Sequence, residues 1–531
     1  MLCFGGSSRD RRNTIPPPTG NRFPTRQYIF IRNKSPFRRE IFGVTRTGSP
    51  LSGDFCRSLD KFTALHKRKA VLFFMREHNR AFKRILFNKP ITEVMMDNIF
   101  GTDGIRGVFG AELNCGSAYL LGAALCGADG DSPVVVVGRD TRPSGEELMR
   151  ALAKGVHDNG GYVINIGILP TNAVAYFTRK MGCDFGVMIS ASHNPPEYNG
   201  LKVFDRYGVK LCEKKQREIS AFMEDREVSD AEGAEVCAFD SAGKLYCDYI
   251  ENLIMPDLKG LKISLDCCYG SCYDVASSVF AKTGAALHVY CGFNRGELIN
   301  KDCGATHTEF LEKMMRSNGC ELGFAFDGDC DRVAVLERGR TLDNDRLLFA
   351  LAKYMSENGM LRKDMVVGTV LTNRGVEMAL NGLNLRLLRS DVGDANVFHL
   401  MSKKGVNLGG ERSGHFLLSD FATGSDALLN ALFFAKIYRE KGSLFDYTAG
   451  YKNVPCREKS INVTPQQLKS MKNSSYFEKV AGEVRALFGG VKLVLRASGT
   501  EPKVRIYIEG EDAGEIEEAM KHTAWQISDF V

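Results

Sequence analysis

The stretch Phe185-Gly-Val-Met-Ile-Ser-Ala-Ser-His-Asn-Pro-Pro196 decides how the rest of this 531-residue chain is interpreted. Its first five residues form an apolar run that is typical of a buried strand. Pro195 and Pro196 cannot donate backbone hydrogen bonds and push Asn194 away from helical geometry, so the chain beyond Ser192 is expected to be a rigid extended loop. Ser192 then lies at the carboxyl end of a strand, the edge at which open α/β sheets bind ligands. The pattern predicts a presented serine that can act as a nucleophile.

Strand and helix patterns alternate around this stretch. Residues 134–137 are a β-branched run, 144–159 repeat apolar residues at helical spacing, 162–166 form a second strand pattern, and a helix is expected from Thr171. The order strand, helix, strand, helix, strand predicts a mostly parallel sheet with helices on its faces.

The same alternation is repeated twice, and the end of the chain differs. Strands are expected at 261–265, 286–290, 322–326, 365–370 and 385–388, with helices after Ser271, near Phe310, after Asn373 and around 397–401. The last 80 or so residues carry strand patterns at 491–495 and 504–508 and a final helix at 515–527. The sequence therefore predicts three similar α/β units followed by one unlike unit.

The segment Asp327-Gly-Asp-Cys-Asp-Arg332 places three carboxylates at alternate positions after an expected strand. The carboxylates repel one another, and a bound cation relieves that repulsion. An EF-hand loop would need Gly at its sixth position and Glu at its twelfth, where this chain has Arg332 and Arg338. A solvated acidic turn is the alternative, which the apolar strand before it disfavours. Oxygen ligands from one loop suit Mg²⁺. The predicted metal ligands are Asp327, Asp329 and Asp331.

Two glycine-rich turns lie upstream of the serine. In Phe100-Gly-Thr-Asp-Gly-Ile-Arg-Gly107 the glycines permit tight turns, and Arg106 can donate two parallel hydrogen bonds to a phosphate. Gly138-Arg-Asp-Thr-Arg-Pro-Ser-Gly145 follows the valine-rich strand, and Ser144 is the expected cap of the next helix. We expect the second turn mainly to support the serine loop.

Two polar turns lie in the second half of the chain. Gly409-Gly-Glu-Arg-Ser-Gly-His415 groups a carboxylate and a hydroxyl that can bind paired sugar hydroxyls with an imidazole that can serve a phosphate or the turn itself. Arg496-Ala-Ser-Gly-Thr-Glu-Pro502 combines hydroxyls, backbone N–H groups and a fixed charge, which predicts a nest for a dianion. The candidate binding residues are Glu411, Ser413 and His415 in the first turn, and Arg496, Ser498, Gly499, Thr500 and the nearby Arg505 in the second.

Taken together, these loops carry a family resemblance. Ser-Ala-Ser-His-Asn-Pro followed by Asn-Gly-Leu-Lys202 resembles the phosphoserine loop of the α-D-phosphohexomutases, and the aspartate, sugar and phosphate loops follow in that family's order. The segment 100–107 is similar to the opening of bacterial phosphoglucosamine mutases. The resemblance implies three similar α/β domains with mixed sheets and a smaller C-terminal α+β domain around a central cleft. The implied boundaries are 98–247, 248–345, 346–452 and 453–531.

The resemblance also implies a reaction. Phosphorylated Ser192 would transfer its group to a sugar monophosphate, and the resulting 1,6-bisphosphate would return its other phosphate to the serine. The phosphoserine would complete the Mg²⁺ site, Arg106 would lie beside it, and a hexose or hexosamine 1,6-bisphosphate would act as activator.

Lys202 is the favoured general base, because a cleft and the neighbouring Arg106 would make its ammonium lose a proton more easily. His193 is the competing base, although its place directly after Ser192 favours loop support. Arg332 completes the predicted catalytic set.

The substrate is less closely defined than the reaction. Similarity over residues 98–531 favours glucosamine 6-phosphate and glucosamine 1-phosphate, and hence amino-sugar nucleotide and peptidoglycan-precursor synthesis. A phosphomannomutase or phosphoglucomutase would use the same loops. Arg412 stands where phosphoglucosamine mutases usually have Gln, and Ala395-Asn396 replaces an Arg-Tyr that commonly follows Val-Gly-Asp, so a displaced arginine could compensate for a lost one.

Two other classes of protein fit the sequence less well. A serine hydrolase is disfavoured because the chain has no Gly-x-Ser-x-Gly elbow and three clustered aspartates would be unexplained. A sugar-phosphate-binding protein without catalysis would dispense with the phosphoserine.

Composition sets the expected surroundings. The chain has no apolar run long enough to span a membrane, and its 16 cysteines form no Cys-x-x-Cys pair, so reduced and mostly buried thiols in the cytoplasm are expected. The expected partner is a small sugar phosphate, with no nucleic acid and no membrane span, and a homodimer is left open.

The first 97 residues differ from the rest in charge. They contain 20 Lys and Arg against 7 Asp and Glu, a charge of +13, and leave 50 against 57, or −7, for residues 98–531. A disordered extension is expected there. A nucleic-acid-binding arm and a targeting peptide fit only in part. The favoured interpretation is a start assigned too early, since Met95 and Met96 precede the first family motif.

Overall fold

The computed structural model describes residues 99–101, 104–129, 132–224, 234, 236–498 and 502–530. The basic extension and the predicted start at Met95 or Met96 lie outside the described residues.

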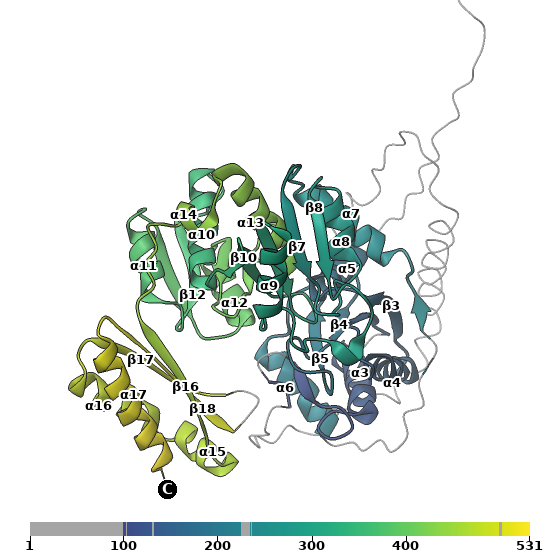
Figure 1. Cartoon of the computed structure of the whole chain (residues 1–531). Coiled ribbons are helices and arrows are strands. Elements are labelled where there is room, and N and C mark those ends of the chain that lie inside the picture. Colours follow the sequence, from purple (N-terminus) through teal and green to yellow (C-terminus); the bar gives the residue numbers. More distant parts are fainter. Residues whose placement is uncertain are drawn as a thin grey trace, which may run out of the picture. The chain divides into compact units, whose positions relative to one another are not determined.

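The first α/β unit is built on a six-stranded sheet with the order β1-β5-β4-β2-β3-β6. Three of its strands, β3, β4 and β5, are labelled in Figure 1. β2 pairs in parallel with β3 and β4, whereas β5 pairs antiparallel with both β4 and β1, so the sheet is mixed. The elements are β1 (Ile105–Val108), α3 (Cys115–Asp129), β2 (Val134–Arg139), α4 (Gly145–Asp158), β3 (Tyr162–Ile168), α5 (Thr171–Met181), β4 (Phe185–Ile189), β5 (Tyr198–Asp205), α6 (Glu213–Glu224), β6 (Cys237–Ala238) and α7 (Ala242–Leu253).

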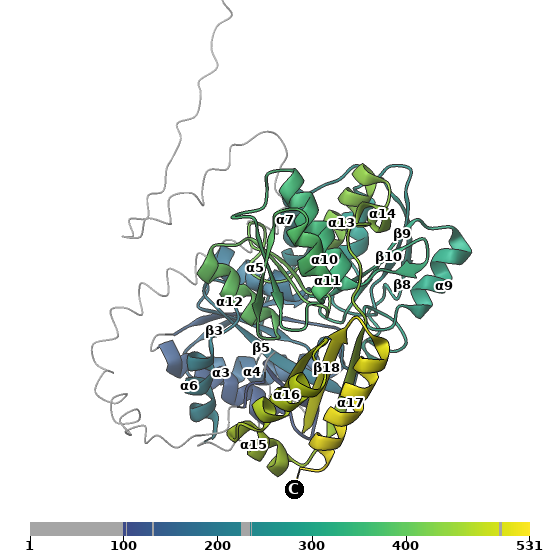
Figure 2. The same ribbon diagram turned by 90° about the vertical axis from the view of Figure 1, so that its left-hand side faces the viewer.

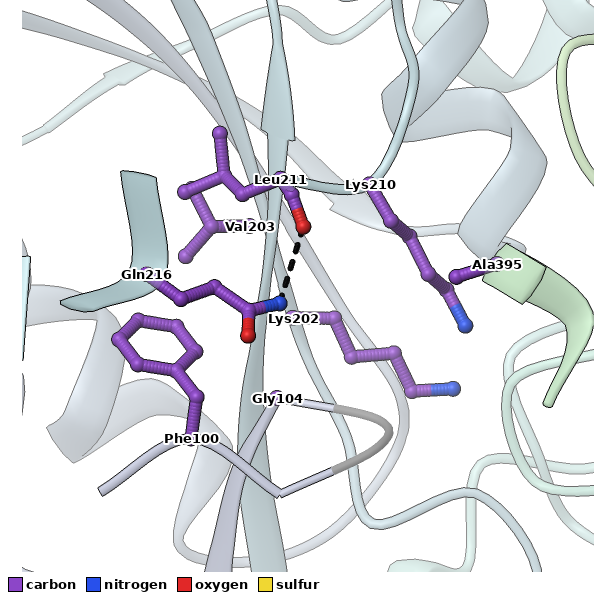
Figure 3. Close-up of a pocket in the computed structure, with 8 residues that line it drawn as sticks. All are labelled: Phe100, Gly104, Lys202, Val203, Lys210, Leu211, Gln216 and Ala395. Atoms are coloured by element: carbon purple, nitrogen blue, oxygen red, sulfur yellow. Dashed lines mark hydrogen bonds between the residues drawn. The ribbon is translucent and has the colours of Figure 1, made fainter. Parts of the chain in front are cut away.

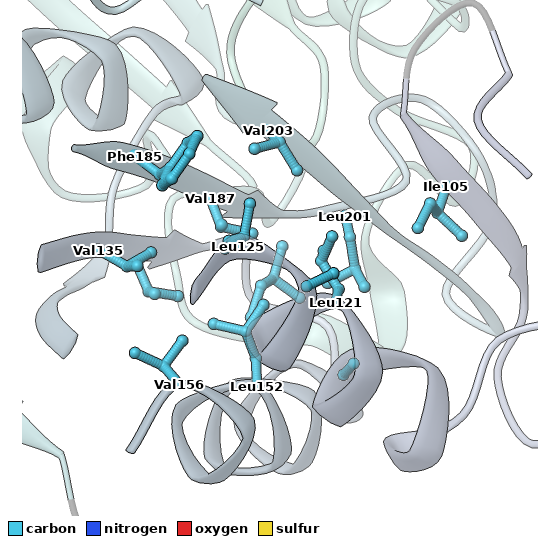
Figure 4. Close-up of a cluster of buried hydrophobic side chains, with 14 of the residues drawn as sticks. Ile105, Leu121, Leu125, Val135, Leu152, Val156, Phe185, Val187, Leu201 and Val203 are labelled. Carbon is cyan, nitrogen blue, oxygen red and sulfur yellow. The ribbon is translucent and has the colours of Figure 1, made fainter. Parts of the chain in front are cut away.

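The prediction of an extended loop beyond Ser192 is wrong for its second half. The chain enters β5 at Tyr198, and most of this strand is buried between β1 and β4. Leu201 and Val203 reach the core beneath the sheet, where they join residues of α3 and α4 (Figure 4). Burial of these side chains favours a strand as soon as the two prolines are passed. Lys202 therefore lies on a strand inside the sheet rather than on the expected rigid loop.

The second unit contains a five-stranded sheet with the order β11-β10-β9-β7-β8. β7 pairs in parallel with β8 and β9, and β10 returns antiparallel to β9. Because β9 is buried along its whole length, the loop between β9 and β10 begins deep inside the protein. The elements are β7 (Lys262–Asp266), α8 (Val275–Ala281), β8 (Ala286–Tyr290), the 3₁₀ helix η3 (Gly296–Leu298), α9 (Glu309–Asn318), β9 (Leu322–Phe326), β10 (Val333–Glu337) and β11 (Arg340–Thr341).

The third unit has a four-stranded sheet with the order β13-β12-β14-β15, in which β12 is parallel to both neighbours and β15 is antiparallel to β14. Its elements are α10 (Asn344–Glu357), β12 (Met365–Thr369), α11 (Arg374–Asn381), β13 (Arg386–Ser390), α12 (Asp394–Lys404), β14 (Leu408–Gly410), β15 (Phe416–Leu418), α13 (Ala427–Lys441) and α14 (Leu444–Tyr447). α13 is buried on nearly all sides and packs against β9 and β10 of the second unit.

The last unit is a three-stranded antiparallel sheet with the order β16-β18-β17. The long helices α16 and α17 pack against it and cover the alternating apolar residues of β18 (Figure 2). Its elements are β16 (Cys456–Asn462), α15 (Pro465–Asn473), α16 (Tyr476–Leu487), β17 (Val491–Ala497), β18 (Lys503–Gly510) and α17 (Ala513–Ser528). The prediction of three similar units and one unlike unit is confirmed.

Two further features bear on the predictions from composition. Most cysteines of the described part of the chain are buried, as expected for structural thiols. Within the described ranges, no helix combines the length and the apolar character needed to cross a bilayer.

Candidate active site

Ser192 lies in the turn between β4 and β5 and is fully buried. Its backbone has a left-handed φ of 54°, a conformation that costs a non-glycine residue about 1–3 kcal/mol. The side chain is also fixed, because Ser192 Oγ donates a hydrogen bond to Asp327 Oδ2 at 2.7 Å. Ser192 of the first unit and Asp327 of the second unit are therefore in direct contact.

Arg142 holds the serine turn by hydrogen bonds to its backbone. Its guanidinium donates hydrogen bonds to the carbonyl oxygens of Ser192 at 3.0 Å and Asn194 at 2.7 Å, and also to those of Pro195 and Tyr198. Nε pairs with the Asp140 carboxylate at 2.9 Å, with both side chains inaccessible to solvent. The expected role of segment 138–145 as a support for the serine loop is confirmed.

Ser144 is the N-cap residue of α4 as predicted, but it does not cap the helix with its side chain. Its Oγ instead accepts a hydrogen bond from Asn199 Nδ2 at 2.9 Å. The buried amide of Asn199 needs an acceptor, and this need decides where the hydroxyl points.

The three aspartates of segment 327–331 are buried together, with ligand atoms within 4.8 Å of one another. Burial raises the pKa of Asp327 to about 7, and repulsion from Asp331 and Asp329 adds to that rise. Asp329 Oδ1 is buried and has no hydrogen-bond partner in the described part of the chain. An orphaned carboxylate oxygen inside an all-oxygen cluster fits a hard divalent cation such as Mg²⁺.

Thr171 is a residue of this cluster that the sequence reasoning missed. Its Oγ1 donates to Asp329 Oδ2 at 2.5 Å and its backbone N–H donates to Asp329 O at 2.9 Å. Thr171 begins α5 in the first unit, more than 150 residues before its partner in the chain. No local pattern could have indicated a pair so distant in sequence.

Lys202 points from β5 into the same cluster. Its Nζ lies 2.6 Å from Asp329 Oδ2 and 2.9 Å from Asp331 Oδ2, and all three side chains are buried. The expectation that the surroundings of Lys202 make it lose its proton easily stays a prediction, and the two carboxylates at contact distance oppose it because they favour a charged ammonium. Arg106, the residue invoked for that effect, lies beside the serine turn, with Nη1 3.5 Å from Asn194 Oδ1.

His193 and Arg332 face each other across the site. Arg332 Nη1 lies 2.9 Å from His193 Nδ1. Burial, together with Arg332 and Arg106, lowers the pKa of His193 to about 3. The ring is therefore neutral at physiological pH and accepts a hydrogen bond from Arg332. A base of such low pKa holds a proton poorly, so His193 is better suited to positioning Arg332 than to proton transfer.

His415 connects the predicted sugar turn to the aspartates. Its Nε2 lies 3.1 Å from Asp331 Oδ1, and its Nδ1 lies 3.0 Å from Glu411 Oε2. Burial alone would lower the pKa of His415, but Asp331 outweighs burial and raises it to about 10. A protonated His415 ring donates hydrogen bonds from both of its nitrogens. Arg332 Nε, which lies 3.2 Å from His415 Nε2, is also a donor, so this contact is not a hydrogen bond.

The remaining two residues of the predicted sugar turn differ in exposure. Ser413 is exposed, with Oγ 3.1 Å from His415 Nδ1. Glu411 is buried, and its Oε1 accepts the backbone N–H of Gly393 at 2.8 Å. The turn is thus preorganised by its own hydrogen bonds, and Ser413 is its accessible hydroxyl.

Arg412 does not replace the arginine that is missing at Ala395. Its guanidinium pairs with Asp345 at 3.2 Å and with Glu458 at 2.8 Å, so it joins the third unit to β16 of the last. A different cation reaches the Ala395 turn, because Lys210 Nζ lies 2.8 Å from Asp394 Oδ1. Figure 3 shows the ends of Lys210 and Lys202 along one pocket, with Ala395 beside Lys210.

The predicted anion nest is described in part. Arg496 on β17 and Arg505 on β18 are cross-strand neighbours, and burial together with Arg505 lowers the pKa of Arg496. Ser498 is buried, and among the described residues its Oγ has no hydrogen-bond partner. Gly499 and Thr500 lie outside the described residues. Two adjacent guanidinium groups and an unpartnered hydroxyl suit a phosphate dianion.

Comparison with known proteins places this arrangement in a family. Four family models, described as phosphoglucomutase/phosphomannomutase α/β/α domains I, II and III and C-terminal domain, match residues 97–229, 244–340, 343–453 and 452–524. The chain belongs to the phosphoglucomutase/phosphomannomutase family. The predicted family and fold class are thereby confirmed, and the chain is an isomerase of the mutase type. The domain boundaries and the roles of individual residues stay predictions.

Relatives and solved structures of this mutase family agree with that placement. The chain is 39% identical to the phosphoglucosamine mutase of Clostridium tetani over 442 residues, which cover 80% of this chain and 97% of the relative. The phosphoglucosamine mutase of Clostridioides difficile is 39% identical over 449 residues, or 81% and 98% of the two chains. A phosphoglucomutase/phosphomannomutase family protein of Burkholderia thailandensis has a similar structure, with a TM-score of 0.68 at 23% identity, over 82% of this chain and 99% of that one.

A more distant mutase structure was determined with ligands. The N-acetylphosphoglucosamine mutase of Aspergillus fumigatus, in complex with GlcNAc-6P and magnesium, has a TM-score of 0.53 at 16% identity, over 81% of this chain and 95% of that one. Similarity at this level of identity supports the shared fold.

Proposed function

We propose that this mutase interconverts glucosamine 6-phosphate and glucosamine 1-phosphate through a phosphorylated Ser192 and a hexosamine 1,6-bisphosphate. The observation that carries the proposal is the contact between Ser192 Oγ and Asp327 Oδ2 at 2.7 Å, in which a strained, buried serine faces a cluster of three carboxylates. A serine that only closed a turn would have no need of a hydrogen bond to a buried carboxylate of another unit.

The transfer moves one phosphoryl group and one proton in each direction. The bond between Ser192 Oγ and phosphorus breaks while a bond forms from phosphorus to a sugar hydroxyl oxygen. The proton of that hydroxyl passes to a base and then to Ser192 Oγ. In the return step the other phosphate of the bisphosphate moves to Ser192, and the serine proton returns to the newly freed sugar hydroxyl. Atoms and charge therefore balance over the cycle.

Asp327, Asp329 and Asp331 are the proposed ligands of Mg²⁺, with an oxygen of phosphorylated Ser192 as a further ligand. When bound, the cation withdraws charge from the phosphoryl oxygens. The orphaned Oδ1 of Asp329 supports this assignment, since it is a buried acceptor that the protein leaves unpaired.

Lys202 is the proposed proton carrier. Its ammonium is 2.6 Å from Asp329 and 2.9 Å from Asp331, and these contacts stabilise its charged form. A bound divalent cation would neutralise the same carboxylates and so weaken that preference, and Lys202 is the residue placed to give up and regain the proton. Arg106 and Arg332, on either side of the serine turn, are placed to bind phosphoryl oxygens during the transfer.

The remaining proposed contacts hold the sugar while its reacting end changes. Ser413 and Glu411 are assigned to the sugar hydroxyls, with His415 orienting the turn. Arg496, Ser498, Gly499, Thr500 and Arg505 are assigned to the phosphate that is not reacting. A substrate that is held by one phosphate and by its hydroxyls can present either end to Ser192, as the two half-reactions require.

The aminosugar assignment rests on relatives of 39% identity that are phosphoglucosamine mutases and match along almost their whole length. One coupled assay tests it by comparing glucosamine 1-phosphate, glucose 1-phosphate and mannose 1-phosphate with a bisphosphate primer and Mg²⁺. We expect the aminosugar to give the highest kcat/KM. Equal values for the three would overturn the aminosugar assignment.

The phosphoenzyme itself is tested by intact mass. Wild-type protein incubated with the bisphosphate should carry one phosphate, and Ser192→Ala should carry none and lose turnover. A wild-type protein that never gains this mass would instead indicate a sugar-phosphate-binding protein.

A further inference from the structure

Asn300 is a buried residue of the second unit that none of the predicted roles includes. It follows η3, and its side-chain amide reaches into the first unit. Nδ2 lies 2.7 Å from the carbonyl oxygen of Ser192 and 3.0 Å from that of Asn194. These two carbonyl oxygens also accept hydrogen bonds from Arg142 Nη2. Two donors from different units therefore hold the same two carbonyl groups.

This double contact acts on the strained residue of the site. The left-handed φ of Ser192 is stable only where surrounding contacts determine it, and its carbonyl oxygen belongs to the following peptide group, whose orientation depends on the φ and ψ of Ser192. Arg142 fixes that peptide group from within the first unit, and Asn300 fixes it from the second unit, which also carries the aspartates. The direction of Ser192 Oγ toward Asp327 depends on both.

Asn300 is itself held rigidly. Its own backbone has a left-handed φ of 57°, which asparagine tolerates, and its N–H donates to Cys268 O at 3.1 Å. The segment around it is tied to β7, because Asp266 Oδ2 accepts the N–H of Gly304 at 2.7 Å and Asp266 Oδ1 accepts that of Cys268 at 2.9 Å. A rigid support of this kind transmits the position of the second unit to the serine.

The aspartate loop also packs closely against the serine turn. A Cβ atom at Gly328, inside the aspartate loop, would lie 2.6 Å from Ser192 O and 3.0 Å from Asn300 Nδ2. The serine turn, the aspartate loop and Asn300 are therefore packed without room for a side chain between them.

We propose that Asn300 is a positioning residue for phosphoryl transfer, which sets the distance and direction between Ser192 Oγ and the three aspartates across the boundary of the first and second units. This inference rests on the proposed phosphoserine function. Asn300 touches no reacting atom, so its loss should lower the rate of transfer to and from Ser192 and leave substrate binding nearly unchanged.

The test uses two substitutions that keep the left-handed backbone accessible. Asn300→Gly removes the amide at a φ that glycine adopts freely, and Asn300→Asp keeps the shape but turns a donor into an acceptor that faces two carbonyl oxygens. We expect kcat to fall about 10- to 100-fold in both, with KM within about threefold of wild type, because small displacements of a reacting group cost rates of this order. Phosphate loading of Ser192 from the bisphosphate, followed by intact mass, should slow by a similar factor.

Asn407→Asp is the matched control. Asn407 is also fully buried, and its Nδ2 donates to Met360 O at 2.8 Å and to Asp420 Oδ2 at 2.7 Å, in the third unit. This variant should lose thermal stability as Asn300→Asp does, yet keep the wild-type kcat. If both Asn300 variants also keep kcat within about threefold of the control, Asn300 is a stabilising residue only and the inference is overturned.

Hydrogen exchange separates this inference from the proposed function. Amides of residues 190–198 should exchange faster in Asn300→Gly than in wild type, and Asn407→Asp should leave them unchanged. That result holds whether or not the protein turns over glucosamine phosphates. Unchanged exchange at 190–198 in Asn300→Gly would show that the serine turn does not depend on Asn300. Absence of phosphoserine in wild type would overturn the proposed function, and faster exchange in Asn300→Gly would then show that Asn300 supports the turn without a role in transfer.

Discussion

Replacing Lys202 with Met should tighten Mg²⁺ binding while it slows turnover. The ammonium lies 2.6 Å from Asp329 and 2.9 Å from Asp331, so it competes with a cation for two of the three proposed ligands. Coulomb's law at an effective dielectric of about 20 gives roughly 6 kcal/mol for each contact, and desolvation of the buried charges offsets most of it. If a net attraction of about 1–3 kcal/mol between Lys202 and the carboxylates is left after desolvation, its removal makes the affinity of Lys202→Met for Mg²⁺ about 5- to 150-fold higher than that of wild type.

Calorimetric titration with Mg²⁺ at about pH 8, where carboxylates of ordinary pKa are ionised, measures this effect. Lys202→Arg keeps the charge and should bind Mg²⁺ like wild type. Lys210→Met removes a second lysine from the same pocket, but one that pairs with Asp394, and it should also bind Mg²⁺ like wild type. Unchanged or weaker Mg²⁺ binding by Lys202→Met would show that Lys202 and the cation do not share these carboxylates.

Three further results are expected. Arg142→Met should destabilise the protein by about 3–5 kcal/mol in urea unfolding, because it leaves the Asp140 carboxylate buried without its cation; a loss below about 1 kcal/mol would contradict this. The pKa of His415 is raised to about 10 from an unfolded value near 6.5, so its contribution to the stability of metal-free protein should be complete below about pH 6.5 and disappear toward pH 10. His415→Gln should flatten that pH dependence, and an unaltered profile would count against a charged ring. Arg412→Gln should raise KM several-fold with little change in kcat, because it breaks the contact with Glu458 of the last unit; steady-state kinetics with an unchanged KM would argue against this link.

The elements that could be predicted from sequence are those whose pattern is local. β4 and β9 begin and end at the predicted residues, since both are uninterrupted apolar runs buried along their whole length. β5 was missed because two prolines precede it and because Asn199, Gly200 and Lys202 interrupt its apolar pattern. Its strand geometry is decided by pairing with β1 and β4, which no local window contains.

In the site, too, residues within local motifs could be predicted, whereas contacts between residues far apart in the chain could not. Ser192 and the aspartates were found from motifs, and the structure brings them into contact. The pairing of Lys202 with the aspartates could not be predicted, because charge neighbours depend on folding rather than on spacing. Asn300 and Thr171 act on partners more than 100 residues away, so sequence patterns carry no signal for them.

The burial of α13 bears on the order in which the protein matures during synthesis. α13 (Ala427–Lys441) packs against β9 and β10, which end at Glu337, so the ribosome must add the whole stretch 338–441 before these strands are covered. Until then the nascent chain keeps an apolar face of this sheet exposed, and such a chain aggregates unless a chaperone binds it. Truncations that stop at the end of the second unit should therefore be recovered as insoluble material, even though that unit has a complete sheet of its own.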